Sequence, residues 1–367
     1  MESPLRFFAG ITDPRVERCK RHLLDEIIFI AIAAVICGAE TWNDMEDFGI
    51  MKYDWLKTFL KLPGGIPSHD TFNRLFSILD PEEFEKRFLE WTSVVSQRTQ
   101  GDIVSIDGKA IRGSRGKGKK SVVYMVSAWA GSNKIVLGQR KVDDKSNEIT
   151  AIPRLLEKLV LRGCIVTLDA MGCQREIAAA IIEKEADYVL ALKGNQGILS
   201  DQVQESFRFL TVESMAQEND LGHGRVEKRT CSVISDLSLI EHKDQWGGLK
   251  SLIRIESERF NKTTTEIEKE TRYFISSLSS SAQCLNGYVR SHWGIENSLH
   301  WSLDVSFNED HSRKRVGYAA ENFSRLNRIS LNLLKNEKTS KRGIKGKRLK
   351  AGWSNQYLIK ILKPENL

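Results

Sequence analysis

The chain has 367 residues, of which 41% are hydrophobic and 28% are charged, with a formal net charge of +7 and a sequence pI of about 9.0. This length allows a sizeable core and two domains, and the basic excess is compatible with a nucleic-acid partner. The apolar run from Ile27 to Cys37 is too short to cross a bilayer, and neither a targeting peptide nor a Walker motif is visible. Six cysteines without CxxC spacing fit reduced thiols. We therefore expect a cytoplasmic protein with no membrane partner and no nucleotide cofactor.

Residues 1–98 have apolar residues at helical spacing and few strand signals, so they predict an all-helical N-terminal domain. Within it, Pro67 leads into HDTFNRLFSIL, and DPEE at 80–83 supplies the next helix with an N-cap, a first-turn proline and acidic residues. Short helices with tight turns permit a helix-turn-helix, in which Ser68, Asn73 and Arg74 would face a DNA groove. The alternative is a small bundle that supports a catalytic domain or a dimer.

Two aspartates follow short runs of β-branched and apolar residues, Asp107 in IVSID and Asp169 in IVTLD. Such runs are typical of buried strands, so both carboxylates are predicted to lie at strand ends. Ligand sites of open α/β sheets lie at the carboxyl ends of strands, where two aspartates on neighbouring strands can share hard divalent cations. Since Asp-Gly is also a common turn signal, Asp107 and Gly108 could form only a turn.

The order of the elements around these aspartates predicts a mixed five-stranded sheet with helices, within a catalytic domain over residues 99–335. Three strands are followed by helix, strand, helix and strand, which is the order of the ribonuclease H fold. In that fold the first and fourth strands are neighbours, which would bring Asp107 and Asp169 together. The predicted elements are strands at 102–107, 122–130 and 135–142, a helix at 149–161, a strand at 164–169, a helix at 173–185 and a strand at 188–193.

A third acid, Glu296, lies in the helical-looking run YVRSHWGIENSLHW. His292, Glu296 and His300 have i, i+4 spacing and could form a zinc site on one helix face, although the HExxH order is missing and the aspartates would have no role. We expect the two histidines instead to contact DNA phosphate or to orient Glu296. Trp293 and Trp301 are expected in the core, with stacking on a displaced base as the alternative.

The segment from Lys109 to Lys120 contains basic residues and no acid. We predict a flexible loop that binds the DNA backbone through its charge; a solvated hairpin loop is the alternative. Its basic residues are Lys109, Arg112, Arg115, Lys117, Lys119 and Lys120.

A second basic segment, residues 335–350, is interrupted by glycines and predicts a charged linker or tail within a C-terminal region at 336–367. The closing run WSNQYLIKILK is expected to form one short helix, which Trp353 would hold against the rest of the protein.

Residues of about 200–278 exceed what a ribonuclease H core needs and alternate as strands do, so they predict an inserted β-rich subdomain. Within it, His223 and Arg225 are expected to contact the cleaved DNA end, unless Arg225 pairs with an acid. Lys193 and Asn195 follow the last core strand and are predicted to lie near the metal site, where Lys193 would neutralise phosphate charge. The alternative for Lys193 is simple solvent exposure.

Five motifs carry a family resemblance: IDGKAIRGS, TLDAMGCQ, YVLALKGNQ, GHGRVEKRT and HWGIENSLHWSLDVSFNEDHSR. In this order, along nearly the whole chain from RFFAGITDPR onward, they resemble the H-repeat-associated, Rhs-element-linked transposases of the DDE class. The resemblance implies cut-and-paste movement of an insertion sequence, with recognition of its terminal inverted repeats and of target DNA. It also implies a homodimer in a synaptic complex, in a bacterial protein that joins the nucleoid when bound to DNA.

The resemblance assigns the catalytic, metal-binding triad to Asp107, Asp169 and Glu296. Related transposases carry a Tyr-x2-Arg-x3-Glu-x6-Lys signature around the third acid, which this chain matches only in part. The flanking positions hold Val289, His292 and Leu303, while Tyr288 and Arg290 stand nearby at shifted spacing. Arg290 and His292 are therefore expected to contact DNA.

The expected mechanism uses two Mg²⁺ ions, for which Mn²⁺ can substitute, with Asp107 bridging them and Asp169 and Glu296 each completing one shell. One ion would activate water or a 3′-hydroxyl, and the other would stabilise the leaving oxygen. Two other functions remain open: a ribonuclease H-like nuclease or domesticated protein that no longer transposes, and a DNA-binding protein with an idle metal site.

Overall fold

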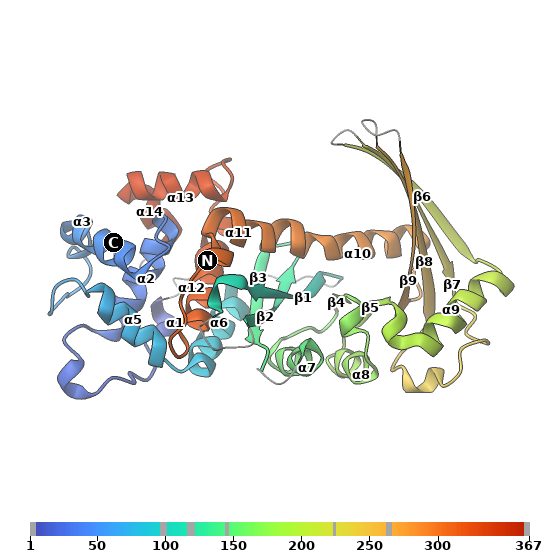
Figure 1. Ribbon diagram of the computed structural model, residues 1–367, viewed down its shortest axis with the longest axis horizontal. Helices are drawn as coiled ribbons and strands as arrows, with labels where there is room; N and C mark the ends of the chain where they lie inside the picture. Colours follow the sequence, from blue (N-terminus) through green and yellow to red (C-terminus); the bar gives the residue numbers. More distant parts are fainter. Residues whose placement is uncertain are drawn as a thin grey trace.

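The computed structural model shows a mixed α/β protein in which a long twisted sheet extends away from a helical region (Figure 1). The first and the last described helices both belong to the helical region, and the sheet occupies the opposite half of the molecule (Figure 1). The structure describes residues 5–95, 101–115, 122–143, 147–222, 225–261 and 266–362.

Residues 5–95 form helices, as the apolar spacing predicts: α1 (Leu5–Phe8), α2 (Leu24–Cys37), α3 (Trp42–Met51), α4 (Tyr53–Leu56), α5 (His69–Ile78) and α6 (Pro81–Val95). Helix α2 is apolar on all sides because other helices surround it, and its residues from Glu26 to Ile36 are buried. The residue that follows the helix, Gly38, has a φ of 117°, which glycine adopts readily and which strains other residues. Helix α3 begins with a capping box formed by Thr41 and Asp44.

The C-terminal segment returns to this helical region and completes its core. Helix α12 (Ala319–Asn336) packs against α2, α5 and α6, and α13 (Ile344–Trp353) and α14 (Asn355–Leu362) also lie against α2. Figure 1 shows these C-terminal helices beside the N-terminal ones. One hydrophobic core therefore joins residues from both ends of the chain.

The prediction of a loose basic tail is wrong for residues 344–350, which belong to α13, whereas the predicted short closing helix is confirmed as α14. Two of the basic side chains are buried and cap other helices. Lys347 Nζ donates to the carbonyl of Leu334, in the last turn of α12, and to that of Glu337, which follows α12. Arg348 donates to Val35 O near the end of α2 at 3.1 and 2.9 Å. Cations at helix C-termini satisfy free carbonyls and oppose the helix dipole. Trp353 is 74% exposed and does not dock the last helix.

The central sheet contains β1 (Ile103–Ile111), β2 (Val123–Ala130), β3 (Ile135–Lys141), β4 (Ile165–Leu168) and β5 (Asp187–Leu192), in the order β3-β2-β1-β4-β5. Strand β1 pairs antiparallel with β2 and parallel with β4, and β4 pairs parallel with β5. The predicted strands correspond to these five, except that β1 continues well beyond Asp107. The predicted adjacency of the first and fourth strands is confirmed.

Helices cover both faces of this part of the sheet. Helices α7 (Glu148–Lys158) and α8 (Arg175–Glu183) lie on one face, and the long helix α10 (Ala282–Gly294) crosses the other (Figure 1). At the edge strand β3, the Asn332 side chain of α12 bonds both the amide and the carbonyl of Val136 at 2.8 Å. These two bonds satisfy the outward-facing backbone groups of one residue on the edge strand.

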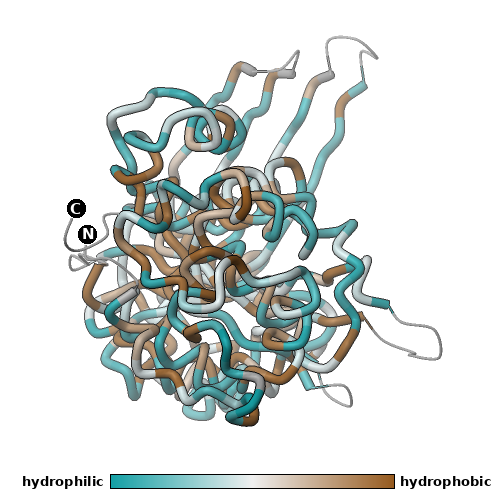
Figure 2. The backbone as a smooth tube through the Cα atoms, turned by 90° about the vertical axis from the view of Figure 1, so that its left-hand side faces the viewer, coloured by the Kyte–Doolittle hydropathy of each residue, from teal (hydrophilic) through white to brown (hydrophobic). Residues whose placement is uncertain are grey.

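The β-rich insertion does not form a separate subdomain. After α9 (Gly197–Phe209), strands β6 (Ser214–Gly222), β7 (Arg225–Ile234), β8 (Ser251–Asn261) and β9 (Ile267–Ser276) extend the central sheet, because β9 pairs antiparallel with β5. The described chain thus has one nine-stranded sheet in the order β3-β2-β1-β4-β5-β9-β8-β7-β6, instead of the predicted five strands. Figure 2 shows the outer strands projecting beyond the rest, with hydrophilic and hydrophobic residues in alternation.

Two further expectations concern the surroundings of the protein. Among the described residues, no helix combines the length and the apolar character that a membrane crossing requires. The cysteines whose side chains are described, Cys37, Cys164, Cys173, Cys231 and Cys284, are free thiols.

Candidate active site

Asp107 and Asp169 lie side by side because β1 and β4 run parallel in register. Ile106 pairs with Leu168, so the next residue of each strand is an aspartate. Asp169 directly follows the last residue of β4, at the strand end as predicted, and accepts a hydrogen bond from Gly172 N at 3.2 Å, which caps the turn of residues 170–172. Asp107, however, lies within β1 and not at its end, because Gly108 onward stays paired with β2. The turn alternative for Asp107 and Gly108 is therefore wrong.

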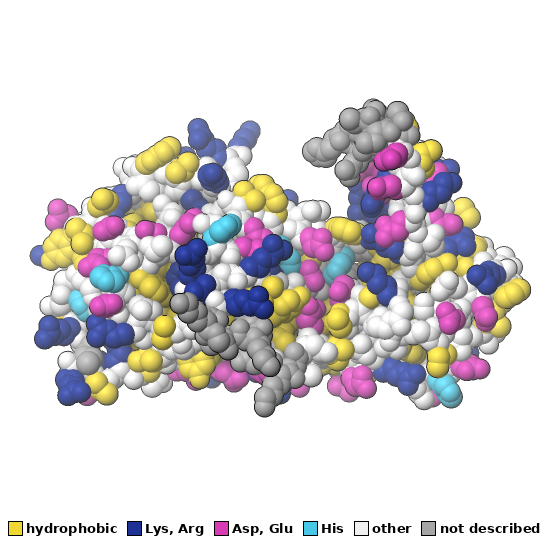
Figure 3. Space-filling view, viewed as in Figure 1, with side chains coloured by type: hydrophobic (Ala, Val, Ile, Leu, Met, Phe, Trp, Pro, Cys, Tyr) yellow, Lys and Arg dark blue, Asp and Glu magenta, His cyan; other side chains and the backbone are white. Residues whose placement is uncertain are grey.

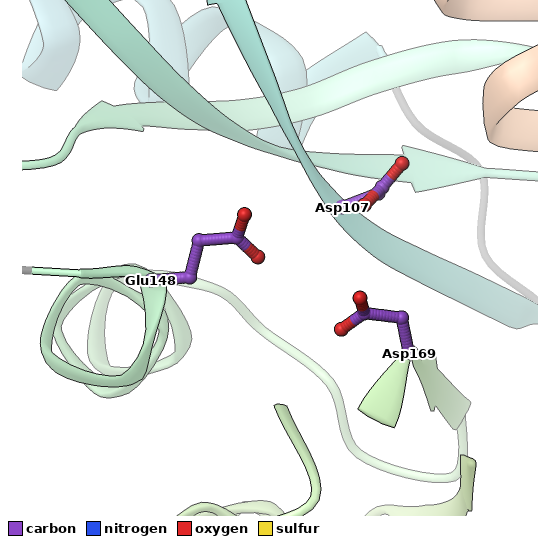
Figure 4. A group of neighbouring side chains, drawn as sticks. All are labelled: Asp107, Glu148 and Asp169. Carbon is purple, nitrogen blue, oxygen red and sulfur yellow. The ribbon is translucent and has the colours of Figure 1, made fainter. Parts of the chain in front are cut away.

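A third carboxylate, Glu148, completes the cluster, and the sequence analysis missed it. Ligand oxygens of Asp107, Glu148 and Asp169 lie within 4.8 Å of one another, and Figure 4 shows the three side chains converging from β1, α7 and the end of β4. Glu148 is the first residue of α7, whose N-cap Asn147 accepts from Ile149 N at 3.2 Å. Strand β3 runs parallel to β1, since both are antiparallel to β2. The residues after β3 therefore return to the edge of the sheet that holds the aspartates, which is the signal that could have predicted Glu148.

Burial and mutual repulsion disfavour full ionisation of this cluster. Burial, together with the neighbouring Asp169, Glu148 and Glu296 carboxylates, raises the pKa of Asp107 to about 7. Burial also raises the pKa of Glu148, while a hydrogen bond from the Tyr124 hydroxyl opposes the rise. A divalent cation would relieve this repulsion, and an all-oxygen set of carboxylates is what Mg²⁺ and Mn²⁺ prefer. The donor set thus fits the divalent metal that the sequence implies.

The histidines of the α10 region point into the protein. Nδ1 of His292 lies 3.0 Å from Thr167 Oγ1 of β4, and burial lowers the pKa of His292. Nδ1 of His300 lies 3.6 Å from Asp107 Oδ2, and burial, helped by the nearby cations Arg328 and Lys109, lowers the pKa of His300 to about 3. Both imidazoles are therefore neutral near pH 7. In this structure the ring of His292 packs on β4, and its predicted contact with DNA stays a prediction.

Glu296 lies on a π-helical segment, Ile295–His300, between α10 and α11 (Trp301–Phe307). It is exposed, whereas His292 and His300 are mostly buried, so the three do not share one face. Among the described residues, the only candidate metal group is the Asp107, Glu148 and Asp169 cluster, which excludes the zinc alternative there. Glu296 is near enough to raise the pKa of Asp107 but lies outside that cluster. Its role as the third acid stays a prediction.

Lys109 is not part of a flexible loop, because β1 extends to Ile111. Its side chain is 8% exposed, and its Nζ lies 2.7 Å from Asp304 and 2.9 Å from Asp310. It therefore joins β1 to the chain after the π-helical segment and is not free for DNA. Arg112 and Arg115, which follow β1, are exposed. Lys117, Lys119 and Lys120 lie outside the described residues.

Other predicted DNA contacts have different surroundings. Lys193 is exposed directly after β5. Asn195 donates from Nδ2 to Ala170 O at 2.7 Å and so braces the turn after Asp169. Arg290 pairs with Glu218 at 3.4 Å and with Asp220. His223 and the side chain of Arg225 lie outside the described residues, although the backbone of Arg225 begins β7.

The residues predicted to read a DNA groove lie on or beside α5. Arg74 is exposed, with its Nε donating to Asp70 O at 3.2 Å; Asn73 is half-buried, and Ser68 precedes the helix. Whether this helix enters a groove stays a prediction. Trp301, predicted as a core residue, is 58% exposed on α11. The guanidinium of Arg272 lies 4.9 Å from the centre of the Trp293 ring.

A parallel strand pair that presents two aspartates in register, joined by a third buried carboxylate, agrees with a metal-dependent DNA enzyme of the DDE transposase class. The family described as Transposase DDE domain matches residues 92–333, and the DDE_Tnp_1-associated family matches residues 5–92. The chain belongs to the DDE transposase family, as the sequence motifs predict.

Among the relatives that span nearly the whole chain, two are named as putative transposases. The putative transposase YncI of Escherichia coli O157:H7 is 42% identical over 370 residues, covering 99% of this chain and 95% of the relative. The H repeat-associated putative transposase YhhI of Escherichia coli strain K12 is 39% identical over 353 residues, covering 93% of this chain and 92% of the relative.

Proposed function

We propose that this protein catalyses cut-and-paste transposition of an insertion sequence by cleaving phosphodiester bonds at terminal inverted repeats and joining the freed ends to target DNA. The observation that carries the proposal is the convergence of Asp107, Glu148 and Asp169 within 4.8 Å in a chain of the DDE family. The strand order β3-β2-β1-β4-β5 supports a ribonuclease H-like core around this site. The relatives are named as putative transposases.

Asp107, Asp169 and Glu296 would hold two Mg²⁺ ions, for which Mn²⁺ would substitute. Bound there, the ions would activate a water or 3′-hydroxyl and stabilise the leaving oxygen of an in-line displacement. Glu148 is a fourth acid of the site and an alternative to Glu296 as a ligand. Its proximity to both aspartates favours it, whereas the family resemblance favours Glu296.

The surrounding side chains keep the carboxylates in place. The Tyr124 hydroxyl donates a hydrogen bond to Glu148, and Asn195 fixes the turn after Asp169. His300, uncharged near pH 7, packs beside Asp107 and helps to exclude water from that carboxylate. The protein thus supplies preorganised oxygen ligands and needs no covalent nucleophile.

The proposal includes a homodimer that synapses two element ends, as the family implies. Each protomer would bind one terminal repeat and contribute one set of carboxylates. Sedimentation or light scattering with and without end-containing duplexes would measure the assembly, and a complex with one protomer and one duplex would contradict it.

The test is cleavage and joining of labelled duplexes that carry the candidate element ends, with Mg²⁺, Mn²⁺ or EDTA. We expect metal-dependent cleavage and joining that Asp107→Asn and Asp169→Asn abolish while DNA binding is retained. Glu148→Gln and Glu296→Gln identify the remaining ligand, because substitution of the essential acid should abolish both cleavage and joining. Asp244→Asn, an exposed carboxylate in residues 243–245, is the matched control.

Three outcomes separate the alternatives. Cleavage without joining would favour a ribonuclease H-like nuclease. DNA binding without cleavage in any divalent metal would favour a domesticated DNA-binding protein. Activity that survives both aspartate substitutions would remove the proposed site.

A further inference from the structure

Two segments that are far apart in sequence, residues 112–115 and 309–315, contact each other beside the end of β1. The turn at Arg112–Ser114 contacts the turn at Glu309–His311 and the residues after it. Gly113 allows this approach, because a Cβ there would lie 2.5 Å from Ser312 O and 2.9 Å from Asp310 O. Arg315 Nε donates to Gly113 O at 3.1 Å. The backbone of each segment therefore fixes the position of the other.

A buried lysine anchors the second segment. Lys314 Nζ donates to Glu40 O at 2.6 Å, and the same ammonium lies 3.4 Å from the centre of the Phe323 ring and 5.2 Å from that of Trp42. Lys314 is 8% exposed, whereas the residues on either side of it, Arg313 and Arg315, are exposed. Burial of Lys314 thus holds the intervening backbone and directs its neighbours outward.

The two segments together present four exposed arginines: Arg112, Arg115, Arg313 and Arg315. Arg112 lies 3.3 Å from Asp310, a carboxylate that also pairs with Lys109. Among the described residues, the other three arginines have no carboxylate within ion-pairing distance. Figure 3 shows Lys and Arg side chains gathered near the middle of this face.

We propose that Arg112, Arg115, Arg313 and Arg315 form one phosphate-binding surface for the DNA duplex next to the cleaved bond. Guanidinium groups bind phosphate oxygens through paired hydrogen bonds, and a cluster of arginines with few carboxylate partners gains from counterion release. Arg112 follows Asp107 by five residues of extended chain, roughly 16 Å, which corresponds to about five base pairs of duplex. The inference rests on the proposed function and adds the place where the flanking duplex is held.

The test measures DNA binding in EDTA, so that no cleavage occurs. Affinity of the full-length protein for a fluorescent duplex carrying one element end is followed between about 50 and 200 mM salt. The variants are Arg115→Gln with Arg313→Gln, the charge-preserving pair Arg115→Lys with Arg313→Lys, and a control pair, Arg162→Gln with Arg208→Gln. The control arginines are exposed and belong to neither segment. Thermal unfolding verifies that all variants are folded.

The slope of log affinity against log salt concentration is negative. We expect the Gln pair to reduce its magnitude by about 1.8, because each lost phosphate contact removes roughly 0.9. The Lys pair should retain the slope, and the control pair should leave it unchanged. A wild-type slope in the Gln pair would overturn the proposal, as would an equal loss in the control pair. A Lys pair as weak as the Gln pair would overturn the role of charge.

The two proposals fail separately. If the Gln pair lowers the salt slope of DNA binding but the wild-type protein cleaves no DNA with Mg²⁺ or Mn²⁺, the transposase function is contradicted and the phosphate-binding surface is supported. If the wild-type protein cleaves and joins ends while the Gln pair keeps the full salt slope, the binding surface falls and the function stands.

Discussion

Gly108 makes room for Glu148: a Cβ on Gly108 would lie 2.5 Å from Glu148 Oε1, and 2.3 Å from a ring carbon of Tyr124. Since Gly108 directly follows Asp107 in β1, the missing side chain is what lets a glutamate from another element reach the aspartates. The residue that follows Asp107 thereby determines whether a second acid, 41 positions further along the chain than Asp107, can join the site.

Gly108→Ala should therefore displace Glu148 and weaken metal binding. We expect Mn²⁺ affinity, measured by calorimetry, to fall about tenfold or more, in keeping with the loss of a positioned ligand or its support. Gly343→Ala is the matched control, because nothing lies within 4 Å of the Cβ it would add. Unchanged Mn²⁺ affinity in Gly108→Ala would show that Glu148 is not a ligand.

Asp107→Asn should stabilise the protein when no metal is bound. Burial and nearby carboxylates raise the pKa of Asp107 from 3.8 to about 7, so its ionised form is disfavoured in the folded state and stability is lost as pH rises from about 4 to 7. At pH 8 in EDTA the variant should be more stable than wild type by about 1 to 4 kcal/mol in denaturant unfolding. It should also lose the stabilisation that Mn²⁺ gives to wild type.

The outcome that contradicts this prediction is equal stability of the two proteins in EDTA together with an equal response to Mn²⁺. Asp244→Asn again serves as the control, because it removes an exposed carboxylate far in sequence from the cluster.

Lys109→Met should destabilise the protein, since it leaves the Asp304 and Asp310 carboxylates without their shared cation. Breaking a buried ion pair by removing one partner costs about 3 to 5 kcal/mol, and urea unfolding would measure it. Adding Asp310→Asn should recover part of the loss, because one unpaired charge is then removed. A double variant that is additive with the singles would show that Lys109 and Asp310 do not interact.

Glu337 should make stability depend on pH in acid. Burial acts to raise the pKa of Glu337, but hydrogen bonds from Thr339, Tyr357 and Ser340 outweigh it and lower the pKa from 4.5 to about 2. The stabilisation from its ionised form is complete above pH 4.5 and is lost as pH falls toward 2. The difference in unfolding free energy between wild type and Glu337→Gln should shrink over that interval, and a constant difference would exclude this role.

The sequence predicts the central strands well because their apolar, β-branched runs are short and bounded by turn residues. Parallel pairing of the first and fourth strands then brings Asp107 beside Asp169. The end of β1 was misplaced because Gly108 resembles a turn residue, whereas here it provides close packing within a paired strand. Asp-Gly alone cannot distinguish these two uses of glycine.

Glu148 and the basic C-terminal segment show where local patterns fail. Glu148 joins the site only through the direction of β3 and the start of α7, which are properties of the whole sheet. In the C-terminal segment, Lys347 and Arg348 look like solvated charges, yet they satisfy carbonyls at the ends of other helices. The π-helical turn at Ile295–His300 likewise breaks the i, i+4 spacing that suggested one face for His292, Glu296 and His300.

The closure of the helical core by α12, α13 and α14 has a consequence for how the protein is made. Helix α2 leaves the ribosome early, but three of the helices that pack against it, α12, α13 and α14, are translated only from residue 319 onward. At ordinary rates of synthesis the delay between α2 and α13 is roughly 15 to 60 s, during which its apolar surface needs chaperones. A chain that stops before α13 never buries that surface, so we expect unfinished products to be degraded before they can occupy DNA ends in place of the full-length enzyme.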